Sequence, residues 1–299
     1  MNKKPLIIAL VLIITAYLGN GIYYDRMKLE EGFFLNHDYE LITEIRGSSL
    51  FELHYLDNRG ESEKISWISV PGLDFIRMNQ SYIRNEGAYV FQEIRTFAFD
   101  SSYMTDEQMQ SLEGVEINKV AVHYSNGQSK EMPIGSIRFI KDESFSKRGS
   151  EIVPLENYSS GSSSTGAGFN AARASESLTI TDAFIRTPIS FSDAFCFEVE
   201  VTGTSQDPHT GAVDRIHQGL QCKESSFPIQ ANKDDTVWIN HMFNRKAVPA
   251  AYTFATFSIQ VTGMRENGES FTHTTHIRHQ PSLSGDDIRS IIKQRRNAE

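Results

Sequence analysis

The feature that most constrains this chain is an uncharged apolar run close to its start. Residues Pro5 to Tyr24 read PLIIALVLIITAYLGNGIYY and contain no charged side chain. A helix needs about 20 such residues to cross the hydrocarbon core of a bilayer. Residues 5–24 are therefore predicted to form a transmembrane helix that anchors the chain, and no later segment offers a second run of this kind.

The charges that flank the run predict its orientation. Lys3 and Lys4 precede it, whereas the charged residues within 25–31 sum to −1. Positive flanking residues tend to stay in the cytoplasm. The tail 1–4 is therefore predicted to be cytoplasmic, and the rest of the chain to lie outside the cytoplasm with the bilayer as its first partner.

A cleaved secretion signal is the alternative interpretation of the same run. Its most apolar part, 6–18, has the length of a signal peptide's hydrophobic segment, and Gly19-Asn20-Gly21 follows it. Glycine is a poor substitute for alanine in the usual A-x-A cleavage pattern, so an uncleaved anchor is favoured. The protein is then a single-pass protein of the cell membrane, and it is secreted if the run is cleaved.

The residues after the run have the pattern of a mainly β protein. Apolar and polar residues alternate in 39–46 and 51–55, as in strands with one buried and one solvent-exposed face. Further strands are predicted over 64–70 and 88–99. Together with a later hairpin they predict an extracytoplasmic antiparallel β domain over 25–156.

Two local sequence patterns predict a short helix and a hairpin within that domain. Thr105 with Gln108 has the spacing of a helix capping box, and Gly114 is placed to end the short helix. Asn126-Gly127 lies between two alternating stretches, and Asn-Gly is the strongest short hairpin signal.

Composition changes abruptly in 157–175, which holds six serines and three glycines. A segment so poor in apolar side chains predicts a flexible linker between two domains. A long loop within a single domain is the alternative.

Short strands return at close spacing over 176–280. Several such strands in about 100 residues are typical of an immunoglobulin-like sandwich. In 195–201 the side chains expected to be buried alternate with Glu198 and Glu200. Asn267-Gly268 predicts a hairpin similar to the one in the first half, which leaves open that the two β domains are related modules.

The segment 281–299 is predicted to be a short amphipathic helix. Ser284 and Asp287 have capping-box spacing, and Leu283 is placed to pack on Ile288. The apolar stripe of this helix is narrow. Docking on the protein's own sheet and binding to a partner are both compatible with it.

Candidate chemical sites are few. His273, His276 and His279 lie in a predicted strand, where His276 points away from the other two, and those two are about 20 Å apart. They cannot share one metal ion. The serine-rich stretch lacks the G-x-S-x-G nucleophile motif, so we predict no catalytic residue, metal site or cofactor.

Cys196 and Cys222 are the only cysteines. Outside the cytoplasm a disulfide between them would persist. Strand parity argues against the bond, because it places Cys196 on a polar face and Cys222 on an apolar one. A bend or bulge in either strand would turn the two side chains to the same face and allow the bond. A disulfide would have a structural role, since no C-x-x-C redox motif is present.

The net charge of the chain limits the kinds of partner that it can bind. The chain carries −9, and −11 without Lys3 and Lys4, so it repels nucleic acid. By elimination, the favoured function is non-catalytic: binding of another protein or a cell-wall polymer, or an adaptor role, at the cell surface or envelope. An envelope hydrolase whose site is assembled from distant residues is the alternative.

Overall fold

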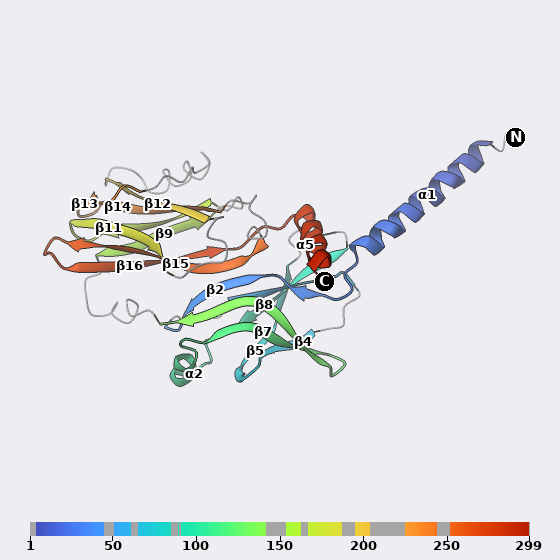
Figure 1. Ribbon diagram of the computed structural model, residues 1–299, viewed down its shortest axis with the longest axis horizontal. Coiled ribbons are helices and arrows are strands. Elements are labelled where there is room, and N and C mark those ends of the chain that lie inside the picture. The colour runs from blue at the N-terminus through green and yellow to red at the C-terminus, as the bar shows by residue number, and fades with distance from the viewer. Residues whose placement is uncertain are drawn as a thin grey trace.

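The computed structural model describes residues 4–44, 51–60, 65–84, 89, 91–141, 154–162, 167–186, 195–203, 225–243 and 252–298. The N-terminal helix α1 (Lys4–Met27) extends away from a body made mainly of strands (Figure 1). Its stretch Ile8–Met27 is long and apolar enough to cross a membrane, and the body does not bury it. The predicted span therefore forms a helix.

The larger of two sheets has twelve strands. In spatial order they are β1 (Phe33–Phe34), β3 (Phe51–Asn58), β6 (Gln92–Phe99), β5 (Leu73–Arg84), β4 (Ile65–Val70), β7 (Glu116–Tyr124), β8 (Ser129–Ile140), β2 (His37–Ile42), β15 (Phe254–Arg265), β11 (Leu178–Ile185) and β13 (Ile229–Ala231), with β16 (Ser270–His279) paired to β15. The predicted hairpins at Gly127 and Gly268 are confirmed, and both glycines have the positive φ that such turns require. Strand β5 is absent from the predicted set, although Ile76 and Met78 alternate with polar residues.

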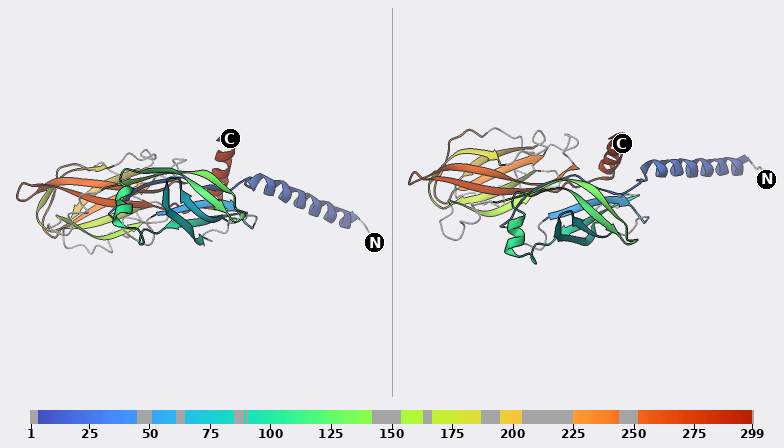
Figure 2. Two further views of the ribbon diagram at one scale, coloured as in Figure 1. Left: turned by 90° about the horizontal axis from the view of Figure 1, so that it is seen from below. Right: turned by 60° about the horizontal axis from the view of Figure 1, so that its bottom comes forward.

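The second sheet has four strands and packs over the β15 region of the first (Figures 1 and 2). Its order is β12 (Phe195–Thr202), β14 (Thr236–Phe243), β10 (Ala167–Ala174) and β9 (Leu155–Ser162). The chain is thus mainly β in two sheets, as predicted, and the pair of sheets fits a β-sandwich.

The predicted linker over 157–175 is wrong. Strands β9 and β10 occupy most of it and pair with each other, and β10 also pairs with β14. Its glycines mark close packing: a Cβ on Gly161 would lie 2.6 Å from the Phe169 ring, and one on Gly168 would lie 2.5 Å from the His241 ring. Glycine in a strand allows such approach of a ring to the backbone, so the small residues here indicate packing.

Strand β2 joins the two halves of the large sheet. It pairs in parallel with β8 on one side and with β15 on the other, whereas the other pairings described are antiparallel. The predicted antiparallel pairing thus has two parallel exceptions, both made by this strand.

The solvent-exposed faces predicted within 39–46 and 51–55 are also wrong for β2 and β3, whereas Ile45 and Arg46 lie outside the described residues. Every residue of β2 and β3 is buried, including Glu40, Glu52 and His54. The sheet curls so that β3 returns against β2, where the Tyr39 hydroxyl donates to the Glu52 carbonyl at 2.9 Å. Polar side chains on both strands are consequently enclosed between the two halves of the molecule.

Both predicted short helices are confirmed. Helix α2 (Asp106–Ser111) begins at Thr105 with the expected capping box. Helix α5 (Gly285–Ala298) begins after Ser284, whose backbone N–H and hydroxyl donate to Asp287. Ile288 and Ile292 of α5 are buried in the core of the first half, so the apolar stripe docks on the protein's own body.

Buried apolar residues form two large clusters. One lies mainly in residues 29–139 and the other in residues 155–277. Phe254 and the residues of α5, however, belong to the first cluster although they come late in the chain. The division into two domains stays a prediction, and the C-terminal helix belongs with the first of them.

Candidate functional site at the foot of the N-terminal helix

The foot of α1, defined here as residues 23–29, is built into the body. A helix leaves its last four carbonyls without partners inside the helix. Here four consecutive carbonyls accept hydrogen bonds from side chains of three other elements: those of Arg26 and Met27, which end α1, and those of Lys28 and Leu29, which follow it. The donors are Arg296 of α5 to Arg26 (2.5 Å) and Lys28 (2.6 Å), Gln92 of β6 to Met27 (2.7 Å), and Asn58 of β3 to Leu29 (2.7 Å).

The Asn58 side chain both donates a hydrogen bond to the Leu29 backbone and accepts one from it. Its side-chain oxygen also accepts from the Leu29 backbone N–H at 2.9 Å, so its amide pairs with Leu29 as a neighbouring strand would. Asn58 and Gln92 are 8% and 3% exposed. Buried polar groups with satisfied partners hold a defined geometry, and the foot therefore has a fixed direction relative to the sheet.

Aromatic contacts support the same junction. The rings of Tyr23 and Tyr24 pack edge-on against Phe91, at centroid distances of 5.8 and 5.2 Å. Arg289 of α5 donates to the Tyr23 hydroxyl at 3.4 Å. Figure 1 shows α5 beside the body end of α1.

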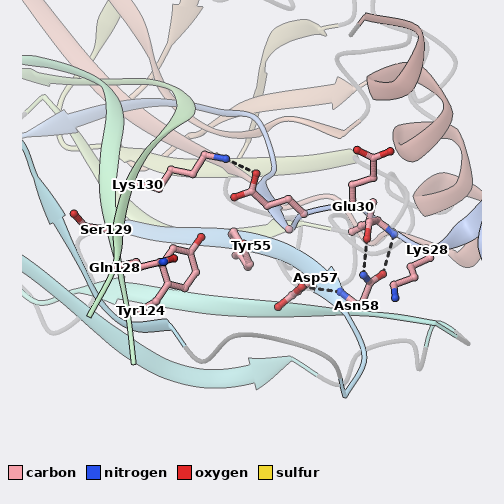
Figure 3. A pocket seen from close by; sticks show the side chains of 12 residues that line it. Lys28, Glu30, Tyr55, Asp57, Asn58, Tyr124, Gln128, Ser129 and Lys130 are labelled. Carbon is pink, nitrogen blue, oxygen red and sulfur yellow. Dashed lines mark hydrogen bonds and ion pairs between the residues drawn. The ribbon is translucent and has the colours of Figure 1, made fainter. Parts of the chain in front are cut away.

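A polar pocket of about 600 Å³ opens next to the foot. It is bounded by the segment 28–32, by β3 and by the hairpin of β7 and β8 (Figure 3). Gly32 allows the wall to form, because a Cβ there would lie 2.5 Å from the Tyr55 hydroxyl oxygen. Lys130 and Glu31 form an ion pair across one side of the pocket.

Burial changes the acidity of two groups in the pocket wall. It raises the pKa of the Asp57 carboxyl, and Arg95, whose Nη2 lies 3.7 Å from Asp57 Oδ2, opposes this effect. Burial, and after it the neighbouring Tyr124, also raises the pKa of the Tyr55 hydroxyl, which therefore stays protonated. The pocket thus offers hydroxyl groups, both signs of charge and a partly buried carboxyl to a polar ligand.

The pocket has no arrangement typical of nucleophilic catalysis. No histidine or cysteine is among the described residues that line it. Elsewhere, Ser258 Oγ lies 3.0 Å from His276 Nδ1, but the same hydroxyl donates to Glu40 at 2.5 Å and is completely buried. A nucleophilic serine needs an accessible hydroxyl that donates to its base, so this trio is structural.

The buried polar side chains between the halves centre on His37. Its Nε2 accepts from the His54 backbone N–H at 3.0 Å, so Nδ1 carries the proton and donates to the Ile134 carbonyl at 3.0 Å. Burial lowers the pKa of His37 from 6.5 to about 4. A neutral imidazole is therefore part of the folded structure.

The three histidines of the predicted strand lie in β16, as expected, and serve separate contacts. His273 Nε2 is 3.1 Å from Asn157 Oδ1, His276 meets Ser258, and the His279 ring stacks on Phe243 at 3.8 Å. The structure does not bring them together.

Cys196 lies half-buried on β12 and takes part in a disulfide. Cys222 lies outside the described residues, so the pairing of the two stays a prediction. We expect the denatured protein from its native compartment to show no titratable thiol until reductant is added, because a bond between the two cysteines leaves neither thiol free. Closing this loop would contribute about 3 kcal/mol to stability. Two thiols without reductant would contradict the pairing.

Sequence reasoning did not find the residues of this junction. Asn58, Gln92 and Arg296 are ordinary polar types, separated by up to 238 positions in the chain. Only the fold brings them to one helix end, and no local pattern indicates it.

Comparisons with known proteins give no family. No family model and no curated protein matches the chain. Two solved structures overlap with it at 11% identity and a TM-score of 0.19: Protocadherin Gamma B7 extracellular cadherin domains 1–4, covering 83% of this chain and 49% of that one, and PcdhgB3 EC1-4, covering 85% and 50%. The chain spans about half the length of each. An overlap this weak carries no argument about function.

Proposed function

We propose that this protein is anchored by α1 in a cell membrane, presents its β body outside the cytoplasm, and acts by binding another protein or a wall polymer. The observation that carries the proposal is the foot of α1. Its carbonyls and tyrosine rings are bonded to β3, β6 and α5. A leader that is removed does not need contacts of this kind.

The exposed surface of the helix supports the anchor. Ile8, Leu12 and Leu18 are each about 60% exposed. Apolar side chains in such a contiguous run are stable where lipid surrounds them. The lysines before the run, and the net negative charge after it, favour a cytoplasmic N-terminus.

Binding fits the polar pocket better than catalysis does. Its wall combines hydroxyls, an ion pair and Asp57 without an adjacent nucleophile and base. Such a surface matches the mixed donors and acceptors of a protein loop or a polysaccharide, whose recognition depends on many polar contacts.

One experiment tests topology and binding together. A photo-crosslinking amino acid is placed at Gln128, an exposed residue of the pocket rim, and at Asp106 on α2 as a control. Cells stripped of their outer layers are irradiated and then treated with protease. We expect a covalent adduct at Gln128 and none at Asp106, because only Gln128 borders the pocket.

The protease supplies the second result. It should remove the body, with its adduct, and leave a short membrane fragment that begins at the native N-terminus. A body protected inside the cell would contradict the topology. An N-terminus after residue 19 would contradict the anchor, and equal adducts at both positions would contradict binding at the pocket.

A further inference from the structure

The residues that follow the polar pocket in the chain, 33–36, line a second cavity of different chemistry. It has a volume of about 470 Å³ and lies between this segment, β8 and α5. Its walls are mainly apolar and include Phe33, Phe34, Ile134, Tyr252 and Ile291. The volume is within the range of small-molecule sites, about 300–1,000 Å³, and apolar walls favour a hydrocarbon ligand.

The rim of this cavity carries positive charge. Arg295 lines it, is exposed, and places its guanidinium 4.3 Å from the centroid of the Phe33 ring. Lys293 and Arg296 are exposed on the same last turns of α5, where no acidic residue accompanies them between 288 and 298. This cationic end contrasts with the chain's net charge of −9.

The cavity is close to the end of the proposed membrane helix. Arg296, which directly follows Arg295, donates to two carbonyls of the foot, and Arg289 reaches the hydroxyl of Tyr23. Tyrosines at the end of a span lie at the level of the lipid headgroups. A ligand with one apolar end and one anionic end, drawn from the bilayer itself, would therefore meet both the cavity and its rim.

We propose that this cavity binds one acyl chain of an anionic phospholipid, with the lipid phosphate at Arg295. The site rests on the proposed function, because only an anchor in the bilayer brings the cavity to the lipid surface. An apolar side chain of a partner protein would fill the cavity equally well, but it would not bring an anionic group to the positively charged rim beside the membrane helix. Arginine binds phosphate through its planar set of donors.

The test uses the full chain in lipid nanodiscs that contain a phospholipid with a photoactivatable acyl chain. Labelled peptides are mapped by mass spectrometry. Label is expected on α1, on 33–36 and on α5. Ile291→Trp, which fills the cavity, should reduce label on 33–36 at least fivefold and leave label on α1 unchanged.

Charge is tested separately. Arg295→Gln should lower cavity labelling by an anionic phospholipid about fivefold, the effect of one basic residue at a lipid surface, with little change for a zwitterionic one. Arg173→Gln is the matched control, because Arg173 is also an exposed arginine over an aromatic ring, that of Tyr158, and lies in the second sheet. Arg173→Gln should leave cavity labelling unchanged for both the anionic and the zwitterionic phospholipid.

The possible outcomes are distinguishable. Label on α1 without label on 33–36 or α5 would overturn the lipid site and keep the anchor, whereas absence of label from α1 would overturn the proposed function. If Ile291→Trp fails to fold by tryptophan fluorescence, Gln294→Trp, an exposed residue at the cavity rim, takes its place. Unchanged labelling of 33–36 in the tryptophan variant that folds would also overturn the site.

Discussion

Lowering the pH from 7 to 4 should reduce the free energy of unfolding by about 3 kcal/mol for each of His37 and His241. Burial lowers the pKa of both imidazoles from 6.5 to about 4 in the folded protein. As the pH falls below 6.5 the unfolded chain takes up protons at these positions, and the folded protein does so only near pH 4. Each pKa unit corresponds to about 1.4 kcal/mol, so the loss accumulates across this window.

The variant that isolates the effect is His241→Phe. The His241 ring lies among Phe195 and Phe243, and the aromatic side chains around it supply the burial that lowers its pKa. Phenylalanine retains the ring without a titrating group. The variant should therefore have near-parental stability at pH 7 and lose about 3 kcal/mol less than the parent on going to pH 4.

Urea unfolding of the detergent-solubilised protein, followed by Trp67 and Trp238, measures these values. Taking the difference between variant and parent removes the contribution of other groups, such as Asp57, whose raised pKa acts in the opposite direction. Ile180→Val is the control, because it removes buried area from the same cluster and no titrating group, and should cost the same at both pH values. If His241→Phe keeps the parental pH dependence, the buried neutral histidine is excluded as its source.

Local patterns predicted the elements that depend on local chemistry. The apolar run, the capping boxes at Thr105 and Ser284, and the Asn-Gly hairpins are each specified by neighbouring residues, and the structure has all of them. The mainly β class followed from alternation within single strands. These features require no knowledge of what packs against the element.

Features that depend on distant partners were not predictable in this way. Glu40 and His54 have the polar character of a solvent-exposed face, yet they are buried because Ser258 and Phe254, more than 190 positions later, cover them. Gly168 belongs to a segment that resembles a linker, but the ring of His241 occupies the space of its missing side chain. Polarity and small size have opposite meanings on a surface and in a core, and the single sequence does not distinguish them.

The candidate site was missed for the same reason. Asn58 and Arg296 reach the end of α1 only because β3 and α5 meet there. Long-range contacts between common residue types leave no motif. The apolar stripe of α5 showed that the helix packs on something, and only the fold showed that it packs beside the anchor.

Phe254→Ala should lower the free energy of unfolding by about 3–5 kcal/mol, the usual cost of removing a buried phenylalanine. The Phe254 ring is 2% exposed and stacks on His54 at a centroid distance of 3.7 Å. Its strand, β15, also supplies Phe257 to the second cluster and pairs with β2 in one continuous sheet. The loss of stability in Phe254→Ala should therefore lower the unfolding midpoint of both halves.

Trp67 in β4 and Trp238 in β14 report on the two halves separately, and they are the only tryptophans. We expect both transitions to shift together to lower urea concentration, because unfolding either half would expose β15 or strand β2. Phe184→Ala is the matched control: that ring is 41% exposed on β11 and should cost less than about 1 kcal/mol. A shift confined to Trp67 would show that the halves unfold independently, as two domains, and that the β2–β15 junction does not couple them.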